Sequence, residues 1–152
     1  MYNHEPPGYS CPFCTLLAGG ETPANSQRDI VLRTELATAL ISPRWWPRNL
    51  GHVLVIPNAH YENLYDLPRE YGHAIHDTVR EIALALRAAY RCAGISTRQH
   101  NEPVGNQDAW HHHVHVFPRY RDDNLYESQP LPGFASGEER WAYADMLRLQ
   151  IN

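Results

Sequence analysis

The sequence has no long hydrophobic run. No segment approaches the about 18 consecutive apolar residues that suggest a membrane-spanning helix. The first ten residues contain no apolar stretch of the kind found in a secretory signal peptide. We therefore expect a cytoplasmic protein without a membrane partner.

Positive charge is also scarce. Lys and Arg number 13 against 17 Asp and Glu, which gives a formal net charge of −4 when the ten histidines are neutral. No block of Lys and Arg is present, whereas proteins that bind the phosphate backbone of nucleic acid rely on a concentrated basic face. Nucleic acid is therefore not an expected partner.

Cysteine is rare. The chain has only three cysteines, and this small, odd number argues against a secreted disulfide framework. Cys11 and Cys14 form a Cys-x-x-Cys motif, which in a reducing compartment more often binds metal than forms a redox pair. A redox pair normally opens a helix after a strand, but this motif follows an aperiodic segment. A redox pair and two unconnected thiols are the alternatives. Cys92 is expected to be a buried apolar side chain late in a long helix.

The chain length and the order of its apolar patterns predict one α+β domain over residues 1–152. Residues 1–10 are expected to form a mobile N-terminal arm or a strap over the surface, and residues 121–152 a C-terminal extension that ends in a helix. An antiparallel sheet of about five strands is predicted in the order β-β-β-α-β-β, with strands at 30–34, 37–42, 52–56, 95–100 and 110–117.

Two helices are predicted from apolar spacing. The long one covers about residues 68–93, where apolar residues recur at alternating four- and three-residue steps, at Ile75, Val79, Ile82, Leu86 and Ala89. The second covers residues 138–149, and its side chains expected to face the body of the protein are Trp141, Met146 and Leu149.

Residues His111 to His115 read His-His-His-Val-His within a β-branched and aromatic run. Alternate side chains of a strand share a face, so His111, His113 and His115 are expected about 6.5 to 7 Å apart on one face, with His112 on the other. The run is internal and strand-like, which argues against an expression tag or a metal-scavenging surface patch. Near neutral pH an imidazole can act as metal ligand, acid, base or nucleophile.

The Cys-x-x-Cys motif supplies two of the four donors that zinc usually requires. No second such motif and no His-x-x-x-His is present, so the other ligands must lie far along the chain. His60 and His111 are the leading candidates. A site with four protein ligands has no open position, and its zinc would be structural.

A loop at residues 43–51 carries two tryptophans between prolines and a glycine. Trp45 and Trp46 either stack on a nucleobase or cover the core or a dimer surface, and the second alternative is favoured. Arg44 and Arg48 either meet a second phosphate or remain solvated.

These motifs together resemble the histidine triad (HIT) superfamily of nucleotide hydrolases and transferases, whose signature is His-φ-His-φ-His-φ-φ. Residues His111 to Phe117 match the signature, and the resemblance covers roughly residues 11–120. It implies a HIT-like fold and extends to Gly51-His52 and the strand that follows, to His60, Asn63-Leu64 and Gln107, and to Pro118-Arg119-Tyr120.

The resemblance also assigns roles to residues. It implies a zinc site of Cys11, Cys14, His60 and His111. His113 would be the nucleophile, and His115 would contact the phosphate and assist the leaving group. The loop with Asn101, Gln107 and Asp108 would bind the substrate phosphate. Members are often homodimers with the long helix at the interface, which here would be residues 68–93.

Two positions depart from the family pattern. Asp108 stands where a Ser or Thr usually follows the Gln, and a carboxylate beside a phosphate is unfavourable unless it meets a cation or points away. Arg44 stands where Asp or Asn commonly holds the ribose hydroxyls, eight residues before His52. Both departures leave the substrate open.

The resemblance implies a nucleotide hydrolase that cleaves a phosphoanhydride or phosphoramidate bond at a nucleoside α-phosphate through a nucleotidyl-histidine intermediate. The alternatives are a nucleotidyl transferase of the uridylyltransferase type, and a nucleotide-binding or scaffold protein with incidental turnover. The sequence leaves the nucleobase, the leaving group, the acceptor and the pathway open.

Overall fold

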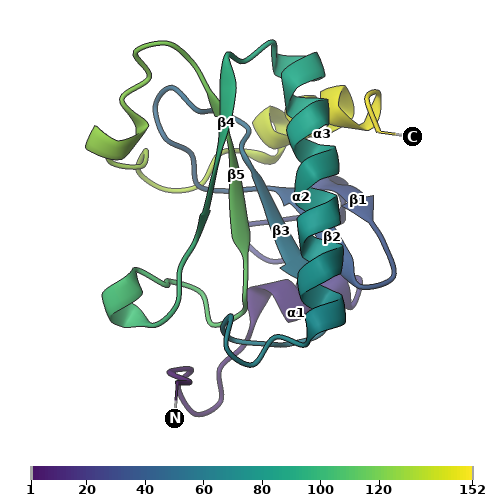
Figure 1. Ribbon diagram of the computed structural model, residues 1–152, viewed down its shortest axis with the longest axis vertical. Helices are drawn as coiled ribbons and strands as arrows, with labels where there is room; N and C mark the ends of the chain where they lie inside the picture. The colour runs from purple at the N-terminus through teal and green to yellow at the C-terminus, as the bar shows by residue number, and fades with distance from the viewer. Residues whose placement is uncertain (1, 152) are drawn as a thin grey trace.

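The computed structural model describes residues 2–151 as a five-stranded antiparallel sheet with helices on both faces (Figure 1). The predicted α+β class and the predicted number of strands are confirmed. The strand order is β1-β2-β3-β5-β4. The strands are β1 (Ile30–Arg33), β2 (Ala37–Ile41), β3 (Val53–Pro57), β4 (Gly94–Gln99) and β5 (Val114–Arg119). The α-helices are α1 (Pro12–Leu17), α2 (Arg69–Tyr90) and α3 (Gly137–Arg148).

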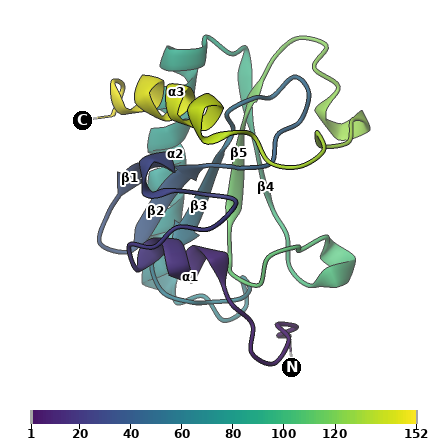
Figure 2. The ribbon, with the colours of Figure 1, turned by 180° about the vertical axis from the view of Figure 1, so that it is seen from behind.

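The central strands β2 and β3 are buried along their whole length. Their side chains alternate between two hydrophobic clusters because successive strand residues point to opposite faces. Ala39 and Val55 belong to the cluster that contacts α2, whereas Leu40 and Leu54 belong to the cluster that contacts α1. Figures 1 and 2 show α2 and α1 on opposite faces of the sheet.

Helix α2 confirms the predicted long amphipathic helix, and its buried residues include Ile75, Ile82 and Leu86. The helix ends at Tyr90, where Arg91 takes a left-handed conformation with φ 53°. Cys92 therefore lies after the helix, not late in it as predicted, although it is buried as expected.

Helix α3 also forms where the sequence predicted a helix, but its buried face differs. Met146 and Leu149 were predicted to face the body, and this is wrong because they are 40% and 84% exposed. A buried ion pair between Arg140 Nε and Asp29 Oδ2, 2.9 Å apart, turns a different face inward. The buried residues of the helix are Arg140, Ala144 and Leu147.

Helix α1 was not predicted. It has six residues, too few to show a helical period in the sequence. Cys11 caps it, because its Sγ accepts the N–H of Cys14 at 3.4 Å. Phe13 and Leu16 then pack in the cluster with Leu54. The Cys-x-x-Cys motif is thereby fixed against the sheet.

Strand β5 begins at Val114, later than the predicted residue 110. On β3 the partner of Val114 is Val55, so an extended ladder would place His112 opposite Pro57. Pro57 ends β3 and has no N–H to donate, and the pairing between β3 and β5 therefore stops at Val114. The histidines at 111 and 113 thus lie in the extended segment before the strand. Pro118 is tolerated within β5 because only β4 pairs with the strand at that residue.

Residues 2–10 lie over the surface as a strap in this structure. The backbone N–H groups of His4 and Glu5 donate to the carboxylate of Glu62. Within residues 2–151, no helix combines the length and apolar character needed to cross a membrane.

Candidate active site and metal centre

The four predicted metal ligands come together beside α1. The Sγ atoms of Cys11 and Cys14 and the Nδ1 atoms of His60 and His111 all lie within 4.8 Å of one another. Cys11 Sγ is 3.4 Å from His111 Nδ1, Cys14 Sγ is 3.3 Å from His60 Nδ1, and the two Nδ1 atoms are 3.2 Å apart. Ligands of a tetrahedral zinc ion are separated by about 3.3 to 3.8 Å. The donor set therefore fits zinc.

The far ring nitrogens of both histidines also suit a metal site. His111 Nε2 is 3.0 Å from the carbonyl oxygen of Pro57, and His60 Nε2 is 2.7 Å from Glu5 Oε2. A proton on each Nε2 directs the Nδ1 lone pair toward the cluster. Burial, with the neighbouring Cys11, raises the pKa of the Cys14 thiol to about 12, so the thiol keeps its proton unless a cation replaces it.

His113 lies next to this cluster and is almost fully buried. Its Nδ1 is 2.8 Å from the carbonyl oxygen of His111, an oxygen that can only accept a hydrogen bond. In the neutral ring the proton is therefore on Nδ1, and Nε2 carries a free lone pair. Nε2 is 3.5 Å from Asp108 Oδ1. The carboxylate accepts a hydrogen bond only from a protonated Nε2, and in that form the contact lowers the pKa of the Asp108 carboxyl.

His115 pairs with a second histidine. Leu54 on β3 is opposite His115, so His52, two residues earlier, shares the face of His115. His52 Nε2 and His115 Nδ1 are 3.2 Å apart. His52 Nδ1 is buried without a hydrogen-bond partner in the described residues.

That unpartnered atom selects the tautomer of the pair. If His115 donated, the proton of a neutral His52 would be on Nδ1 as a buried N–H without an acceptor, which is rare and costs about 1–3 kcal/mol. His52 therefore donates through Nε2–H. The proton of His115 is then on its own Nε2, available for donation.

The histidine pair is fixed by stacked rings. His52 and His115 both stack on Phe117, and their ring centroids lie 4.3 and 5.5 Å, respectively, from the centroid of Phe117. Trp46 packs edge-on against His52, and the guanidinium of Arg98 lies 4.6 Å from the centroid of Phe117. No site role was expected for His52 or Arg98 from the sequence. The strand register places both side chains at the site, because Arg98 on β4 is opposite His115 and His52 shares the face of His115.

A pocket of about 230 Å³ opens at His113 and His115, on the α1 face of the sheet. Asp108 and Arg44 both line it, and the charge of Arg44 contributes to the lowered pKa of Asp108. Its wall includes residues from six separate segments, among them Pro12, Phe13, Asn25, Ser42, Trp46, Leu54, His113, His115 and Phe134.

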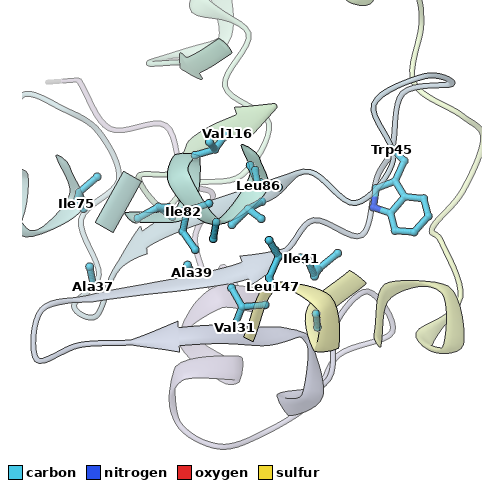
Figure 3. Close-up of a cluster of buried hydrophobic side chains, with 14 residues drawn as sticks. Val31, Ala37, Ala39, Ile41, Trp45, Ile75, Ile82, Leu86, Val116 and Leu147 are labelled. Atoms are coloured by element: carbon cyan, nitrogen blue, oxygen red, sulfur yellow. The ribbon is translucent and has the colours of Figure 1, made fainter. Parts of the chain in front are cut away.

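The two tryptophans have different places. Trp45 is in the hydrophobic core and its Nε1–H donates to Ser42 O, as the favoured core alternative predicted (Figure 3). Trp46 instead lines the pocket. Arg44 also lines the pocket, whereas Arg48 donates to the carbonyl oxygen of Asp122.

Asn101 and Gln107 do not line the pocket. The Asn101 side chain exchanges hydrogen bonds with Gln99 and accepts the N–H of Leu64. Gln107 donates to the carbonyl oxygen of Glu62 at 2.6 Å and accepts the N–H of Glu102. Both side chains therefore hold the loop that presents Asp108. Their predicted contact with substrate stays a prediction.

His112 lies on the opposite face of the sheet from the pocket at His113 and His115. It is 2% exposed and packs near Ile75 and Val79 of α2. This agrees with the predicted orientation and with a packing role.

The free energy of unfolding is expected to fall as the pH drops below about 6.5. Burial, aided by Arg98 and His113, lowers the pKa of His52 from 6.5 to about 3. Between these values the unfolded chain binds a proton at His52 that the folded chain does not. The stability that this difference in proton binding contributes is fully present above pH 6.5. It decreases by about 1.4 kcal/mol per pH unit as the pH falls from 6.5 toward about 3.

Urea denaturation of wild type and His52→Gln across this pH range measures the effect. The variant should be less stable at neutral pH, but its stability should depend less steeply on pH. Protonation of the other titratable groups affects both proteins alike. Equal pH slopes would show that His52 does not remain neutral in the folded protein.

Comparison with known proteins places the chain in a family. The HIT domain profile matches residues 24–122, more than half of the chain. The protein called hit from Bacillus subtilis (strain 168) is 31% identical over 111 residues, 73% of this chain and 72% of that protein.

Two solved structures share the fold over almost the whole chain. A Hit-like protein from Bartonella henselae superimposes with a TM-score of 0.76 at 26% identity, covering 91% of this chain and 94% of that one. A zinc-bound histidine triad family protein from Mycobacterium smegmatis has a TM-score of 0.74 at 27% identity, covering 93% and 92%.

Two further relatives are named as hydrolases. An adenylylsulfatase of Arabidopsis thaliana is 26% identical over 121 residues, 80% of this chain and 58% of that protein. An adenosine 5'-monophosphoramidase of Saccharomyces cerevisiae is 28% identical over 114 residues, 75% and 65% of the two chains. The family profile, the similarity to the Bacillus protein and the shared fold lead to one conclusion: the chain belongs to the histidine triad (HIT) family.

Proposed function

We propose that the protein is a nucleotide hydrolase that cleaves a phosphoanhydride or phosphoramidate bond at a nucleoside α-phosphate. The observation that carries the proposal is the orientation of His113. Its Nδ1 donates to the carbonyl oxygen of His111, so an unprotonated Nε2 is available at a pocket. A histidine nucleophile requires this state of the ring.

In the first step, His113 Nε2 forms a bond to the α-phosphorus and the bond from phosphorus to the leaving group breaks. His115 would donate a hydrogen bond from its Nε2–H to the leaving group and stabilise the negative charge that develops there, while a departing amine takes its proton from solvent. In the second step, water attacks the phosphorus and the bond to His113 breaks. The attacking water gives up a proton to solvent, which balances the proton taken up by the leaving group, so both histidines regain their starting states.

Two charged side chains at the pocket, Asp108 and Arg44, affect how a substrate phosphate would bind. Asp108 is close to the proposed nucleophile and would repel a phosphate, but Arg44 lines the same pocket and its charge acts on Asp108. We propose that Arg44 offsets this repulsion when substrate binds. Trp46 and Phe134 offer aromatic surface in the same pocket for a nucleobase.

We propose that Cys11, Cys14, His60 and His111 hold a structural zinc ion. The ion would fix α1 and the residues before β5 relative to each other, and it would therefore hold the segment that carries His113. Four protein ligands leave no open position for water, so the chemistry belongs to the histidines.

We also propose that the protein is a homodimer. Strand β4 is at the sheet edge and can pair with another chain, next to the predicted interface at residues 68–93. Light scattering should give twice the 17.5 kDa mass of one chain, and a monomer mass would contradict the proposal.

The proposed hydrolase is tested by brief mixing of wild-type protein with adenosine and guanosine phosphoramidates and dinucleoside polyphosphates. Denaturing mass spectrometry should detect a transient nucleotidyl adduct, and its mass identifies the nucleotide. Nucleoside diphosphate formed in the presence of inorganic phosphate would instead indicate a transferase. Retained nucleotide in a native spectrum, without adduct or turnover, would indicate a binding protein.

A further inference from the structure

The N-terminal strap reaches the proposed zinc centre through Glu5. Its Oε2 is 2.7 Å from His60 Nε2, the ring nitrogen opposite the Nδ1 that faces the metal cluster. The side chains of Glu5 and His60 are 41% and 35% exposed. An exposed contact of this kind carries weight only if the backbone around it is fixed.

Glu62 fixes that backbone. Its side chain is buried, and its two carboxylate oxygens accept the N–H groups of His4 and Glu5 at 2.7 and 2.8 Å. Glu62 is two residues after His60, so the strap is anchored to the segment that supplies this ligand. The position of Glu5 relative to His60 is thus defined by backbone hydrogen bonds.

The strap is also tied to the segment that supplies the other histidine ligand. The hydroxyl of Tyr9 accepts the N–H of Trp110 at 3.2 Å, directly before His111. His4 Nε2 is 3.1 Å from Glu102 Oε2, and the rings of His4 and Trp110 are 5.9 Å apart. Residues 2–10 therefore connect the two distant segments on which the ligands His60 and His111 lie.

We propose that Glu5 is a positioning residue for the metal centre, an inference that rests on the proposed zinc site. Its carboxylate accepts the Nε2–H of His60, which keeps the lone pair on Nδ1 and makes that nitrogen a stronger ligand. Carboxylate partners of metal-bound histidines typically change metal affinity about 10- to 100-fold. Solvent screening of this contact places the expected effect at about 10-fold.

The test is the zinc dissociation constant, measured by competition with a chromophoric chelator. Glu5→Ala should raise it about 10-fold, and Glu5→Gln should raise it less because an amide oxygen still accepts the bond. Glu102→Gln is the matched control, since it alters a contact of the strap that does not involve a metal ligand. Its zinc dissociation constant should equal that of wild type.

A second measurement separates positioning from general support of the fold. Zinc-free wild type and zinc-free Glu5→Ala should unfold at the same denaturant concentration. An unchanged dissociation constant in Glu5→Ala, or an equal rise in Glu102→Gln, would overturn the role of Glu5. Wild type that binds no zinc would overturn the zinc centre itself, and the inference with it.

Discussion

Replacing His113 with alanine is expected to lower kcat/KM for a nucleoside phosphoramidate on the order of 10⁴-fold or more. The substitution removes the Nε2 atom that would bond to phosphorus. His115 and His52 keep their mutual hydrogen bond, because neither depends on His113 for it. The nucleotidyl adduct should also be absent from the mass spectrum of the variant.

Two further variants make this result specific. His73→Ala changes an exposed histidine on α2 and should leave turnover unchanged. His115→Gln removes the imidazole N–H proposed to stabilise the leaving group and should lower the rate by about 10²- to 10³-fold. If His113→Ala kept more than a tenth of wild-type kcat/KM, covalent catalysis by this residue would be ruled out.

Replacing Cys14 with serine is expected to abolish stoichiometric zinc binding and to lower the thermal unfolding midpoint. Zinc that binds only the folded chain stabilises it by about 4 kcal/mol at a thousand times its dissociation constant. For a chain of this size the loss corresponds to a shift of about 8 to 16 °C. Zinc content and calorimetry with and without a chelator measure both effects.

Cys92→Ser is the matched control for the zinc prediction. Cys92 is a buried thiol outside the ligand cluster, so this variant should keep its zinc and remain sensitive to the chelator. Cys14→Ser should be insensitive to the chelator because it has no zinc to lose. Wild-type zinc content in Cys14→Ser would disprove the proposed site.

The sequence predicted the fold well where a pattern is periodic and long. Helix α2 has 22 residues, enough to show its apolar period, and each strand pattern lies within a few residues of its position in the structure. The six residues of α1 were missed because a short helix held by tertiary packing has no readable period. The buried face of α3 was misassigned because the pair of Arg140 and Asp29, far apart in sequence, turns the helix.

The candidate site shows the same division. The spacing of Cys11 and Cys14 and the alternation of His111, His113 and His115 are local patterns, and the sequence displays them directly. The pairing of His52 with His115 depends on the register between two strands that are distant in sequence, so no local pattern reveals it.

Local sequence patterns suffice to assign the family, the order of the strands and of the two longer helices, and the types of residue available for metal binding and catalysis. The folded structure is needed to establish which ring nitrogen of His113 is free and which way the pair of His52 and His115 donates. It is also needed to show that the N-terminal segment reaches His60 through Glu5. Tautomers and ligand geometry depend on hydrogen-bond partners, and distant segments of the chain supply most of those partners here.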